Sequence, residues 1–397
     1  MGPDGWLRRL GPWVGIGTSP AALMAGGGVA EGLRGAELVA AIVVGVVLLT
    51  GLALVQGLLG QRTGAPLAAL TAGPLGREGS RLTASVVMLA MMLGWFGVNV
   101  GVAGVALGRL VGIPDVAGVI LFASLMLAIV SLGLSVLSWS ALVAGIATTS
   151  LAAYGLHLAL ADHDATLSGG HTATDPIGFL PAVTLVIGYG AAFSLRTPDF
   201  THDLARPRQV VWCALTGLAA PVLAFALAGA VLQAATGQWD LADVLRGLGS
   251  SEIAYLFVAV GFTGSVLTNI WSGALSLEDA APRVPHRTAL LAVAAVGAVL
   301  AGAGFDDLML SWLTAMALAA PGLVAVCLIH AARGDRVEDG WRAAGLAAWG
   351  SGFACGIGLH LAGSPLALPA ATLVPALVYW LSRRPGERDL VDATQGG

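Results

Sequence analysis

The sequence predicts an all-α polytopic membrane protein, a single domain over residues 1–397 with twelve transmembrane helices. Three observations lead to this prediction. Hydrophobic residues make up 57% of the chain and charged residues only 11%, against about 25% in soluble domains. Long apolar segments follow one another along the whole chain, and its mean hydropathy is +0.85. The arginines, finally, gather in alternate loops between these segments.

The apolar segments supply the helices, because a membrane-spanning helix needs about 20 mostly apolar residues. Residues 116–161 carry no charge and are too long for one helix, so we expect a tight turn at Ser138–Ser140. In chain order, the twelve predicted helices span residues 12–30, 37–60, 83–108, 116–136, 138–160, 177–195, 209–235, 253–277, 288–304, 308–331, 342–362 and 366–382.

The arginines orient this arrangement, since cytoplasmic loops are rich in basic residues. With both termini in the cytoplasm, sixteen arginines fall inside and only Arg34, Arg109 and Arg246 fall outside. We therefore expect a multi-pass protein of the cell membrane, in contact with the lipid bilayer. The net charge of −4 argues against a nucleic-acid partner, and the oligomeric state is left open. Three separated cysteines in apolar segments are expected to be buried thiols: Cys213, Cys327 and Cys355.

The first apolar segment carries an interruption, "GIGTSP". Pro20 removes a backbone N–H and disfavours helical geometry at Ser19. Irregular backbone at membrane depth survives only where protein buries it or where it lines a wet cavity. We expect unwound backbone over residues 15–20. The glycines at 26–28 are expected to serve close helix packing instead.

The sixth segment repeats the interruption with "VIGYGAAFS", which places Gly188, Tyr189 and Gly190 in mid-span. Segments one and six correspond if the chain consists of two five-helix halves, about 12–160 and 177–331, followed by extra helices over 342–382. Two interrupted helices in matching positions indicate the binding site of an inverted-repeat secondary transporter. The alternative is that these glycines only allow close packing.

The third segment contains "GWFGVNVG", with Trp95 and Asn99 one helical turn apart on the same face. A flat indole beside an amide suits a planar ligand that forms hydrogen bonds. The alternative is a packing tryptophan and an interhelical hydrogen bond. Glycines at spacings of three and four form a smooth stripe for a neighbouring helix: Gly94, Gly97, Gly101, Gly104 and Gly108.

The eighth segment has a small polar face in an apolar helix. Such a face either joins helices or coordinates a small cation. No span has an obvious carboxylate for a proton relay, and no catalytic motif of a hydrolase or metalloprotease occurs, so we expect no enzyme. The face comprises Ser265, Thr268, Asn269, Ser272 and Ser276.

Several motifs resemble one family in order along the chain. They are "RTG" at 62–64, "GWFGV" at 94–98, "TPDFT" at 197–201, "TNIWSGAL" at 268–275 and "SWLTAMALAAPG" at 311–322. Together they resemble the nucleobase:cation symporter-1 family, and most of all its bacterial cytosine permeases. The resemblance implies the leucine-transporter type of fold, a five-plus-five inverted repeat with two additional C-terminal helices.

The resemblance also implies the uptake of a planar nucleobase coupled to a cation, Na⁺ or H⁺, with no other cofactor. Trp95 takes the position of the aromatic residue that stacks on the base. Asn269 and Ser272 fall where the eighth helix helps to hold sodium, and backbone carbonyls at Gly15 and Ser19 would complete a possible sodium site.

The chain departs from the family pattern where the cytosine permeases read the base and bind sodium. Met92 replaces a glutamine, Gly190 an aromatic residue, and Gly273 and Ala274 a hydroxyl and an asparagine. Tyr189 and Asn99 supply a ring and an amide from shifted positions. The expected substrate site comprises Trp95, Asn99, Thr18, Ser19, Tyr189, Gly190 and Asn269.

These expectations combine into a secondary active permease that imports a nucleobase or related planar heterocycle by alternating access. A hydroxymethylpyrimidine precursor of thiamine, a purine, allantoin and hydantoin are equally admissible substrates. Two further alternatives stay open: an amino-acid or amine carrier of the same fold, and a relative that senses its ligand without moving it.

Overall fold

The computed structural model describes residues 7–162, 176–239, 241, 244, 247, 252–334 and 337–382. Within these residues the secondary structure is helical, without strands. The helices are α1 (Leu7–Gly17), α2 (Ala21–Gly32), α3 (Gly35–Thr63), α4 (Leu67–Leu75), α5 (Arg77–Gly79), α6 (Ser85–Val111), α7 (Asp115–Val130), α8 (Leu134–Asp162), α9 (Phe179–Thr201), α10 (Pro207–Trp212), α11 (Ala220–Thr236), α13 (Glu252–Ala280), α14 (His286–Gly302), α15 (Met309–Arg333), α16 (Ala343–Leu361) and α17 (Ala367–Leu381). Two π-helical turns, η1 (Ser80–Ala84) and η2 (Cys213–Ala219), and one 3₁₀ turn, η3 (Phe305–Leu308), join some of them.

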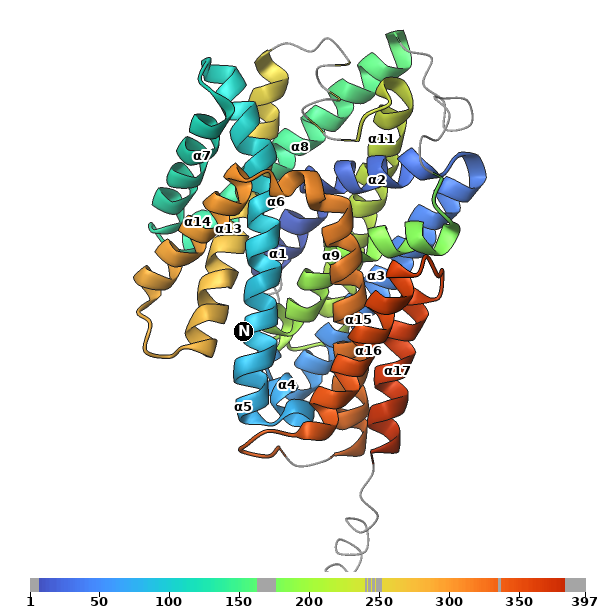
Figure 1. Ribbon diagram of the computed structural model, residues 1–397. Coiled ribbons are helices and arrows are strands. Elements are labelled where there is room, and N and C mark those ends of the chain that lie inside the picture. The colour runs from blue at the N-terminus through green and yellow to red at the C-terminus, as the bar shows by residue number, and fades with distance from the viewer. Residues whose placement is uncertain are drawn as a thin grey trace, which may run out of the picture.

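Each apolar segment predicted from the sequence coincides with one helix or with consecutive helices, and these gather side by side into a bundle (Figure 1). The number of membrane crossings and the cytoplasmic placement of both termini stay predictions. Among the described residues, seven helical stretches are long and apolar enough to cross a membrane: Gly35–Thr63, Arg77–Val111, Val143–Ala161, Phe179–Thr201, Pro207–Thr236, Ala254–Ala280 and Phe305–Arg333.

The turn in the long uncharged stretch lies earlier than the sequence predicted. Helix α7 ends at Val130, and α8 begins at Leu134 and continues through Ser138–Ser140. Gly133 has a φ of 102°, a conformation that favours glycine, and the Ser131 hydroxyl donates to the Leu127 carbonyl at 2.7 Å. The expected turn at Ser138–Ser140 is therefore wrong, because the positive φ is supplied by glycine earlier in the chain.

The interruption in the first predicted helix is confirmed, and it is shorter than predicted. Helix α1 ends at Gly17 and α2 begins at Ala21. The Ser19 N–H donates to the Ile16 carbonyl at 3.1 Å, three residues back, so the α-helical ladder stops there. Gly15 lies inside α1 and is not unwound.

The predicted interruption in the sixth helix is wrong. Helix α9 runs without a break from Phe179 to Thr201. A Cβ added to Gly188 would lie 1.9 Å from the Leu313 carbonyl oxygen, and one on Gly190 would lie 2.7 Å from a methyl carbon of Leu49. The two glycines therefore let α15 and α3 approach α9 closely, which is the alternative that the sequence left open.

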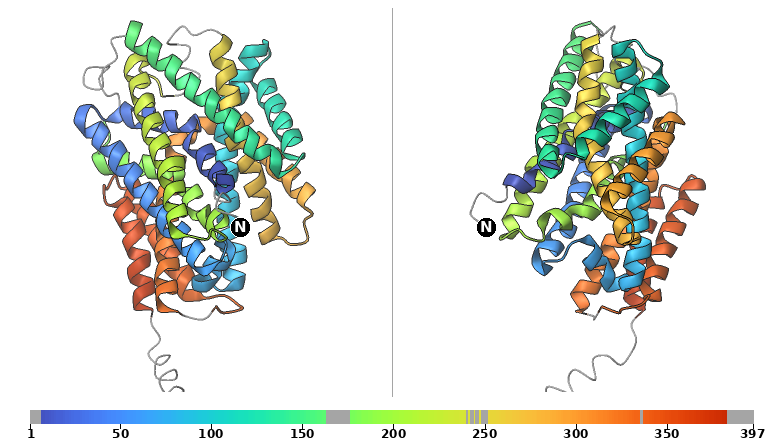
Figure 2. Two further views of the ribbon diagram at one scale, coloured as in Figure 1. Left: turned by 180° about the vertical axis from the view of Figure 1, so that it is seen from behind. Right: turned by 90° about the vertical axis from the view of Figure 1, so that its left-hand side faces the viewer.

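Close glycine contacts join α2 to α11 and α3 to α9, and further packing of α1 and α2 on α9 and α11 unites these helices into one body. Added Cβ atoms on Gly26 and Gly229 would each lie 1.9 Å from a carbonyl oxygen of the other helix, Ala226 on α11 and Leu23 on α2. One on Gly60 of α3 would lie 2.7 Å from the α carbon of Pro198 on α9. Figure 2 shows these helices together from two further sides. We call this group the inner bundle.

A second body consists of α6, α7, α13 and α14, which contact one another extensively. We call it the scaffold. The predicted glycine stripe is a packing surface: an added Cβ on Gly104 would lie 2.4 Å from the α carbon of Val119 on α7. An added Cβ on Gly94 would lie 2.2 Å from the indole of Trp312 on α15. Helices α16 and α17 pack on each other at the edge of the bundle, beside α15 (Figure 1).

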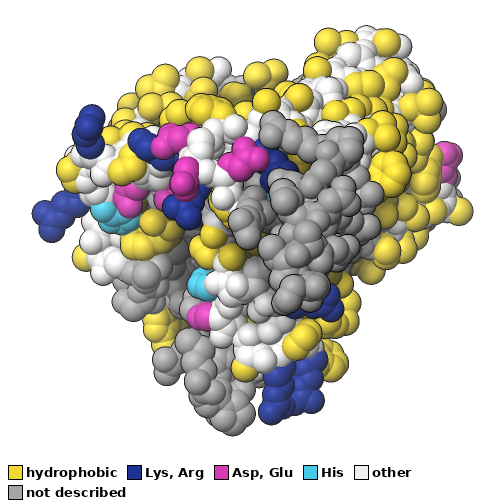
Figure 3. Space-filling view, turned by 90° about the horizontal axis from the view of Figure 1, so that it is seen from below, with side chains coloured by type: hydrophobic (Ala, Val, Ile, Leu, Met, Phe, Trp, Pro, Cys, Tyr) yellow, Lys and Arg dark blue, Asp and Glu magenta, His cyan; other side chains and the backbone are white. Residues whose placement is uncertain are grey.

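Apolar side chains cover much of the outside, as lipid contact requires. Large exposed hydrophobic residues occur on α3, α7, α14 and α17, with Val47, Ile120, Val299 and Leu373 as examples. Cys355 is exposed on α16, so its predicted burial is wrong, whereas Cys213 and Cys327 are buried as expected. Arginine and acidic side chains gather on the face seen from below (Figure 3), the end of the bundle at which α4 and α5 lie.

Candidate functional site

A cavity of about 40 Å³ lies where the break between α1 and α2 faces α6, α9 and α13. The inner bundle supplies one wall and the scaffold the other. Six residues that the sequence assigned to the substrate or the cation line this cavity: Ser19, Trp95, Asn99, Tyr189, Asn269 and Ser272. Tertiary packing thus brings together side chains from four helical segments.

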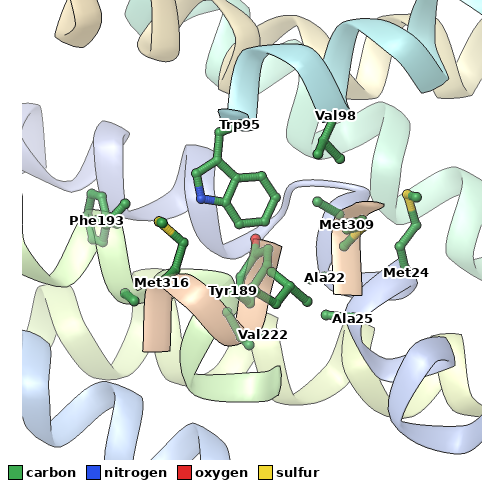
Figure 4. Packing of buried hydrophobic residues seen from close by; sticks show 14 of the residues in the cluster. Ala22, Met24, Ala25, Trp95, Val98, Tyr189, Phe193, Val222, Met309 and Met316 are labelled. Carbon is green, nitrogen blue, oxygen red and sulfur yellow. The ribbon is translucent and has the colours of Figure 1, made fainter. Parts of the chain in front are cut away.

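Trp95 and Tyr189 form the aromatic part of the cavity. Their ring centroids are 5.9 Å apart and their planes are nearly perpendicular, at 86°. The Tyr189 hydroxyl donates to the carbonyl of Ile16, in the last turn of α1. Figure 4 shows the indole projecting from its helix toward the tyrosine ring, with Phe193 to one side. Tyr189 is therefore held by the broken helix, and Trp95 lines the cavity beside it.

Two amide side chains in the cavity have an unpartnered polar atom. Asn99 is 2% exposed and Asn269 is 3% exposed. Among the described residues nothing bonds to Oδ1 of Asn99 or to Nδ2 of Asn269. A buried polar atom without a partner costs about 1–3 kcal/mol, so native proteins rarely keep one without a reason. Together these atoms offer one acceptor and one donor to a ligand.

The hydroxyls at the helix break are engaged with each other. The Ser19 hydroxyl donates to the Ser265 hydroxyl at 3.4 Å and accepts from the Ala21 N–H at the same distance. The Ser265 hydroxyl donates to the Phe262 carbonyl at 3.0 Å. Ser19 therefore links the unwound backbone to α13 through its side chain.

Three residues predicted for the site lie outside the cavity lining. The Thr18 hydroxyl donates to the Val14 carbonyl at 2.7 Å and faces Gly145 on α8. Gly190 packs against Leu49 of α3 and does not line the cavity. Gly15 stays helical and lines a wider space outside the cavity. Thr18 and Gly15 are close in sequence to the break and Gly190 is next to Tyr189, but none of the three is turned toward the cavity.

The wider space, which we call the vestibule, has a volume of about 600 Å³. It is lined by α1, α4, the beginning of α6 and the ends of α9 and α13, so it lies at the end of the bundle that α4 occupies (Figure 1). The positive-inside distribution predicts that this end is cytoplasmic. Four residues line both the vestibule and the cavity and thus separate them: Arg196, Phe200, Thr268 and Ser272.

Arg196 lines the cavity with a charged side chain, and the sequence did not single it out as functional. It is 7% exposed, and its guanidinium donates to the Ser272 carbonyl at 2.8 Å, to the Ser276 hydroxyl at 3.3 Å and to Asp199 at 3.0 Å. Arg196 directly follows the apolar segment 177–195, so from the sequence it looks like an ordinary basic residue at the cytoplasmic end of a helix. Asp199, three residues later, could have indicated an ion pair with it.

Two neighbouring phenylalanines were also missed. Phe193 and Phe200, two turns apart on α9, stack with centroids 5.7 Å apart and planes 19° apart, and both line the cavity. Trp13 of α1 contacts Phe193 edge-on at 5.1 Å. Their spacing of seven residues on one helical face could have indicated this stack.

The model of a protein family described as permease for cytosine/purines, uracil, thiamine, allantoin matches residues 12–340. The chain belongs to this permease family. The family also agrees with the resemblance seen in the motifs.

Curated relatives of the permease include cytosine permeases of Escherichia coli. That of strain O157:H7 is 27% identical over 235 residues, which cover 58% of this chain and 55% of the relative. That of strain K12 is 26% identical over the same length. The matched region thus spans about half the length of these curated relatives.

Solved structures show the fold that the permease adopts. Mhp1, a nucleobase-cation-symport-1 family transporter in a closed conformation with bromovinylhydantoin bound, has a TM-score of 0.79 at 18% identity, over 94% of this chain and 91% of Mhp1. The inward-facing conformation of Mhp1 also has a TM-score of 0.79, at 17% identity, over 94% of this chain and 88% of Mhp1. A Na⁺-coupled sialic acid symporter has a TM-score of 0.64 at 14% identity, over 95% of this chain and 89% of the symporter. The permease thus has the Mhp1 fold, in line with the fold type predicted.

Proposed function

We propose that this permease is a secondary transporter that imports a nucleobase or a related planar heterocycle, driven by a cation gradient. The observation that supports the proposal best is the cavity in which the Trp95 ring and the unpartnered atoms of Asn99 and Asn269 meet. A planar ring with adjoining N–H and C=O groups needs an aromatic face, an acceptor and a donor. Cytosine, in the names of the curated relatives, and the hydantoin bound to Mhp1 are heterocycles with such groups.

The charge of the cavity bears on the choice among ligand classes. The guanidinium of Arg196 lines it and pairs with Asp199 at 3.0 Å, so its charge is already compensated. Among the described lining residues of the cavity no acidic side chain is present to pair with a cationic ligand, and a buried charge without a partner is costly. This supports a neutral heterocycle over an amine. Uracil, allantoin, hydantoin and a hydroxymethylpyrimidine remain members of the proposed class.

The arrangement of the helices supports alternating access. Glycine contacts hold each of the two bodies together, whereas polar and aromatic contacts join them across the cavity. Helix α3 packs on α9 and α11 packs on α2, which is the matched pairing that two inverted repeats, over 12–160 and 177–331, produce. With the vestibule at the end that the arginines predict to be cytoplasmic, this arrangement would face inward, and rocking of the inner bundle against the scaffold would close it.

Replacing the indole tests the ligand assignment. Base–aromatic stacking is worth about 1–3 kcal/mol, so Trp95→Ala should weaken heterocycle binding by roughly 5- to 150-fold. The measurement is uptake of labelled cytosine, uracil and hydantoin into proteoliposomes under Na⁺ and H⁺ gradients, together with ligand-induced thermal shifts of the purified protein.

Trp212→Ala is the matched control, because that indole is 56% exposed on α10 and does not line the cavity. It should leave uptake unchanged. Unchanged uptake by Trp95→Ala would contradict the stacking site. If amino acids compete for the binding site and none of the heterocycles does, the protein is an amino-acid or amine carrier. If a heterocycle binds but does not accumulate under either gradient, the protein is a sensor.

A further inference from the structure

The polar face of α13, where the resemblance places part of a sodium site, is held by a cationic side chain of the protein itself. Nη1 of Arg196 lies 2.8 Å from the Ser272 carbonyl oxygen and 3.3 Å from the Ser276 hydroxyl oxygen. The side chain is buried at the boundary between cavity and vestibule. Its Nε donates to Asp199, which in turn accepts from the Leu67 N–H at 2.8 Å.

These contacts engage two oxygen atoms of the polar face, the Ser272 carbonyl oxygen and the Ser276 hydroxyl oxygen. The Ser272 carbonyl also accepts from the Ser276 hydroxyl at 2.9 Å. A carbonyl oxygen has two lone pairs, and both are engaged here. The Ser276 hydroxyl gives its hydrogen to that carbonyl and turns a lone pair toward Arg196. The guanidinium thus sits among oxygen acceptors in the manner of a bound cation.

The remaining members of the expected sodium site offer few free oxygen atoms. Ser19, Asn269 and Ser272 line one cavity, whereas Gly15 lies inside α1 and lines the vestibule. The Ser19 carbonyl accepts from the Ala22 N–H at 2.9 Å, and the Ser19 hydroxyl bonds to Ser265. Gly273 and Ala274 follow Ser272 and have no side-chain oxygen. The residues present therefore do not fit Na⁺, which prefers a shell of several oxygen atoms.

The guanidinium also connects the two bodies that would move. Arg196 belongs to α9 of the inner bundle, and Ser272 and Ser276 belong to α13 of the scaffold. A bound cation at this level would connect the same two bodies and be released in each cycle. A covalently attached cation cannot leave, so its contribution is present at every stage and independent of the Na⁺ concentration.

We infer that the guanidinium of Arg196 replaces a coupling sodium ion, and that this permease needs no Na⁺. The inference rests on the proposed transport function. It assigns to Arg196 a positioning role, because the side chain acts by joining α9 to α13 next to the ligand rather than by recognising the ligand alone. A gradient other than Na⁺, such as H⁺, would then drive accumulation.

The test compares Na⁺ with choline for the wild type, Arg196→Gln and Arg196→Lys. In the wild type, Na⁺ alone should leave the melting temperature of the purified protein unchanged, and heterocycle uptake should agree within about twofold in the two salts. Arg196→Gln frees the oxygens of Ser272 and Ser276. Na⁺ alone should then raise its melting temperature by about 2 °C or more, and uptake should become Na⁺-stimulated by about tenfold. Arg196→Lys keeps a fixed charge and should stay indifferent to Na⁺.

Arg208→Gln is the matched control, since this arginine is exposed on α10 and does not line the cavity or the vestibule. It should behave as the wild type. Na⁺-dependent uptake or Na⁺-induced stabilisation of the wild type would overturn the inference, and so would a folded Arg196→Gln protein that ignores Na⁺. If no heterocycle is bound or taken up in any salt, the proposed function fails, whereas the Na⁺ response of the ligand-free proteins still decides the role of Arg196.

Discussion

At the scale of single residues, Asn99 combines a cost in stability with a role in binding. Its Oδ1 atom is buried in the middle of α6 without a partner among the described residues. Trp95, one turn earlier on the same helix, lines the same cavity. Such an amide lowers the stability of the empty protein and gains its hydrogen bond only when a ligand is present.

Asn99→Leu should therefore stabilise the protein and abolish its response to ligand. Leucine has a similar volume and no polar atom to satisfy, so the free energy of unfolding should rise by about 1–3 kcal/mol. Melting curves of the purified protein, with and without heterocycle, measure both effects. Thr50→Val is the control, because the Thr50 hydroxyl already donates to the Val46 carbonyl at 2.7 Å. A lower melting temperature for Asn99→Leu would show that the amide has a structural partner.

At the scale of elements, glycine serves two different purposes in these helices. At the first predicted break, Pro20 interrupts the backbone ladder, and the neighbouring glycines only accompany it. At Gly188 and Gly190 the ladder is intact, and the missing Cβ atoms admit α15 and α3. Glycine occurs both at the break between α1 and α2 and in the continuous helix α9. The two places differ because proline removes a backbone N–H at the break, which glycine does not do.

Gly188→Ala should destabilise the protein strongly. Its Cβ would lie 1.9 Å from a backbone oxygen, which cannot rotate away as a side chain does. Overpacking of this kind costs about 1–3 kcal/mol, and occasionally more. Gly51→Ala on α3 is the matched control: nothing lies within 4 Å of its added Cβ. This change should stabilise the helix by about 0.5–1 kcal/mol. Thermal melting in detergent compares the two variants, and equal melting temperatures would contradict the assigned α9–α15 contact.

At the scale of the whole molecule, the cavity and the vestibule define a direction. The vestibule is the larger space, about 600 Å³ against 40 Å³, and it is lined by α4 together with α1, α9 and α13. Arg196 and Phe200 stand between the two spaces. Under the proposed function, the ligand would enter or leave through the vestibule, on the side that the arginine distribution predicts to be cytoplasmic.

Cysteine labelling tests this direction. In a Cys355→Ser background, which removes the exposed native thiol, Leu275→Cys places a thiol in the vestibule. A membrane-impermeant maleimide should label it in inside-out vesicles and leave it unlabelled in intact cells. Leu366→Cys is the control, since this residue is 57% exposed between α16 and α17, at the opposite end of α16 from its contact with α4. The reverse pattern at the two positions would place the vestibule outside.

Much of the site was predictable because its residues stand out from an apolar background. Trp95 and Asn99 share a helical face by their spacing, and Asn269 and Ser272 do so on α13; all four line the cavity. Thr18, Gly15 and Gly190 were expected with them because they are close in sequence to a break or to Tyr189. Side-chain direction depends on where the helix ends and how it is rotated, and no local pattern shows either.

The sequence by itself determined that this chain is a membrane-embedded helical protein of the permease family, since hydropathy, spacing and motifs are properties of the chain order. Only the tertiary structure decided which interruption is real and which polar groups meet. It turned Gly188 into a packing contact and set the guanidinium of Arg196 on the oxygens of α13. The physical reason is that a helix satisfies its own backbone, so the neighbours of each face depend on how separate helices pack.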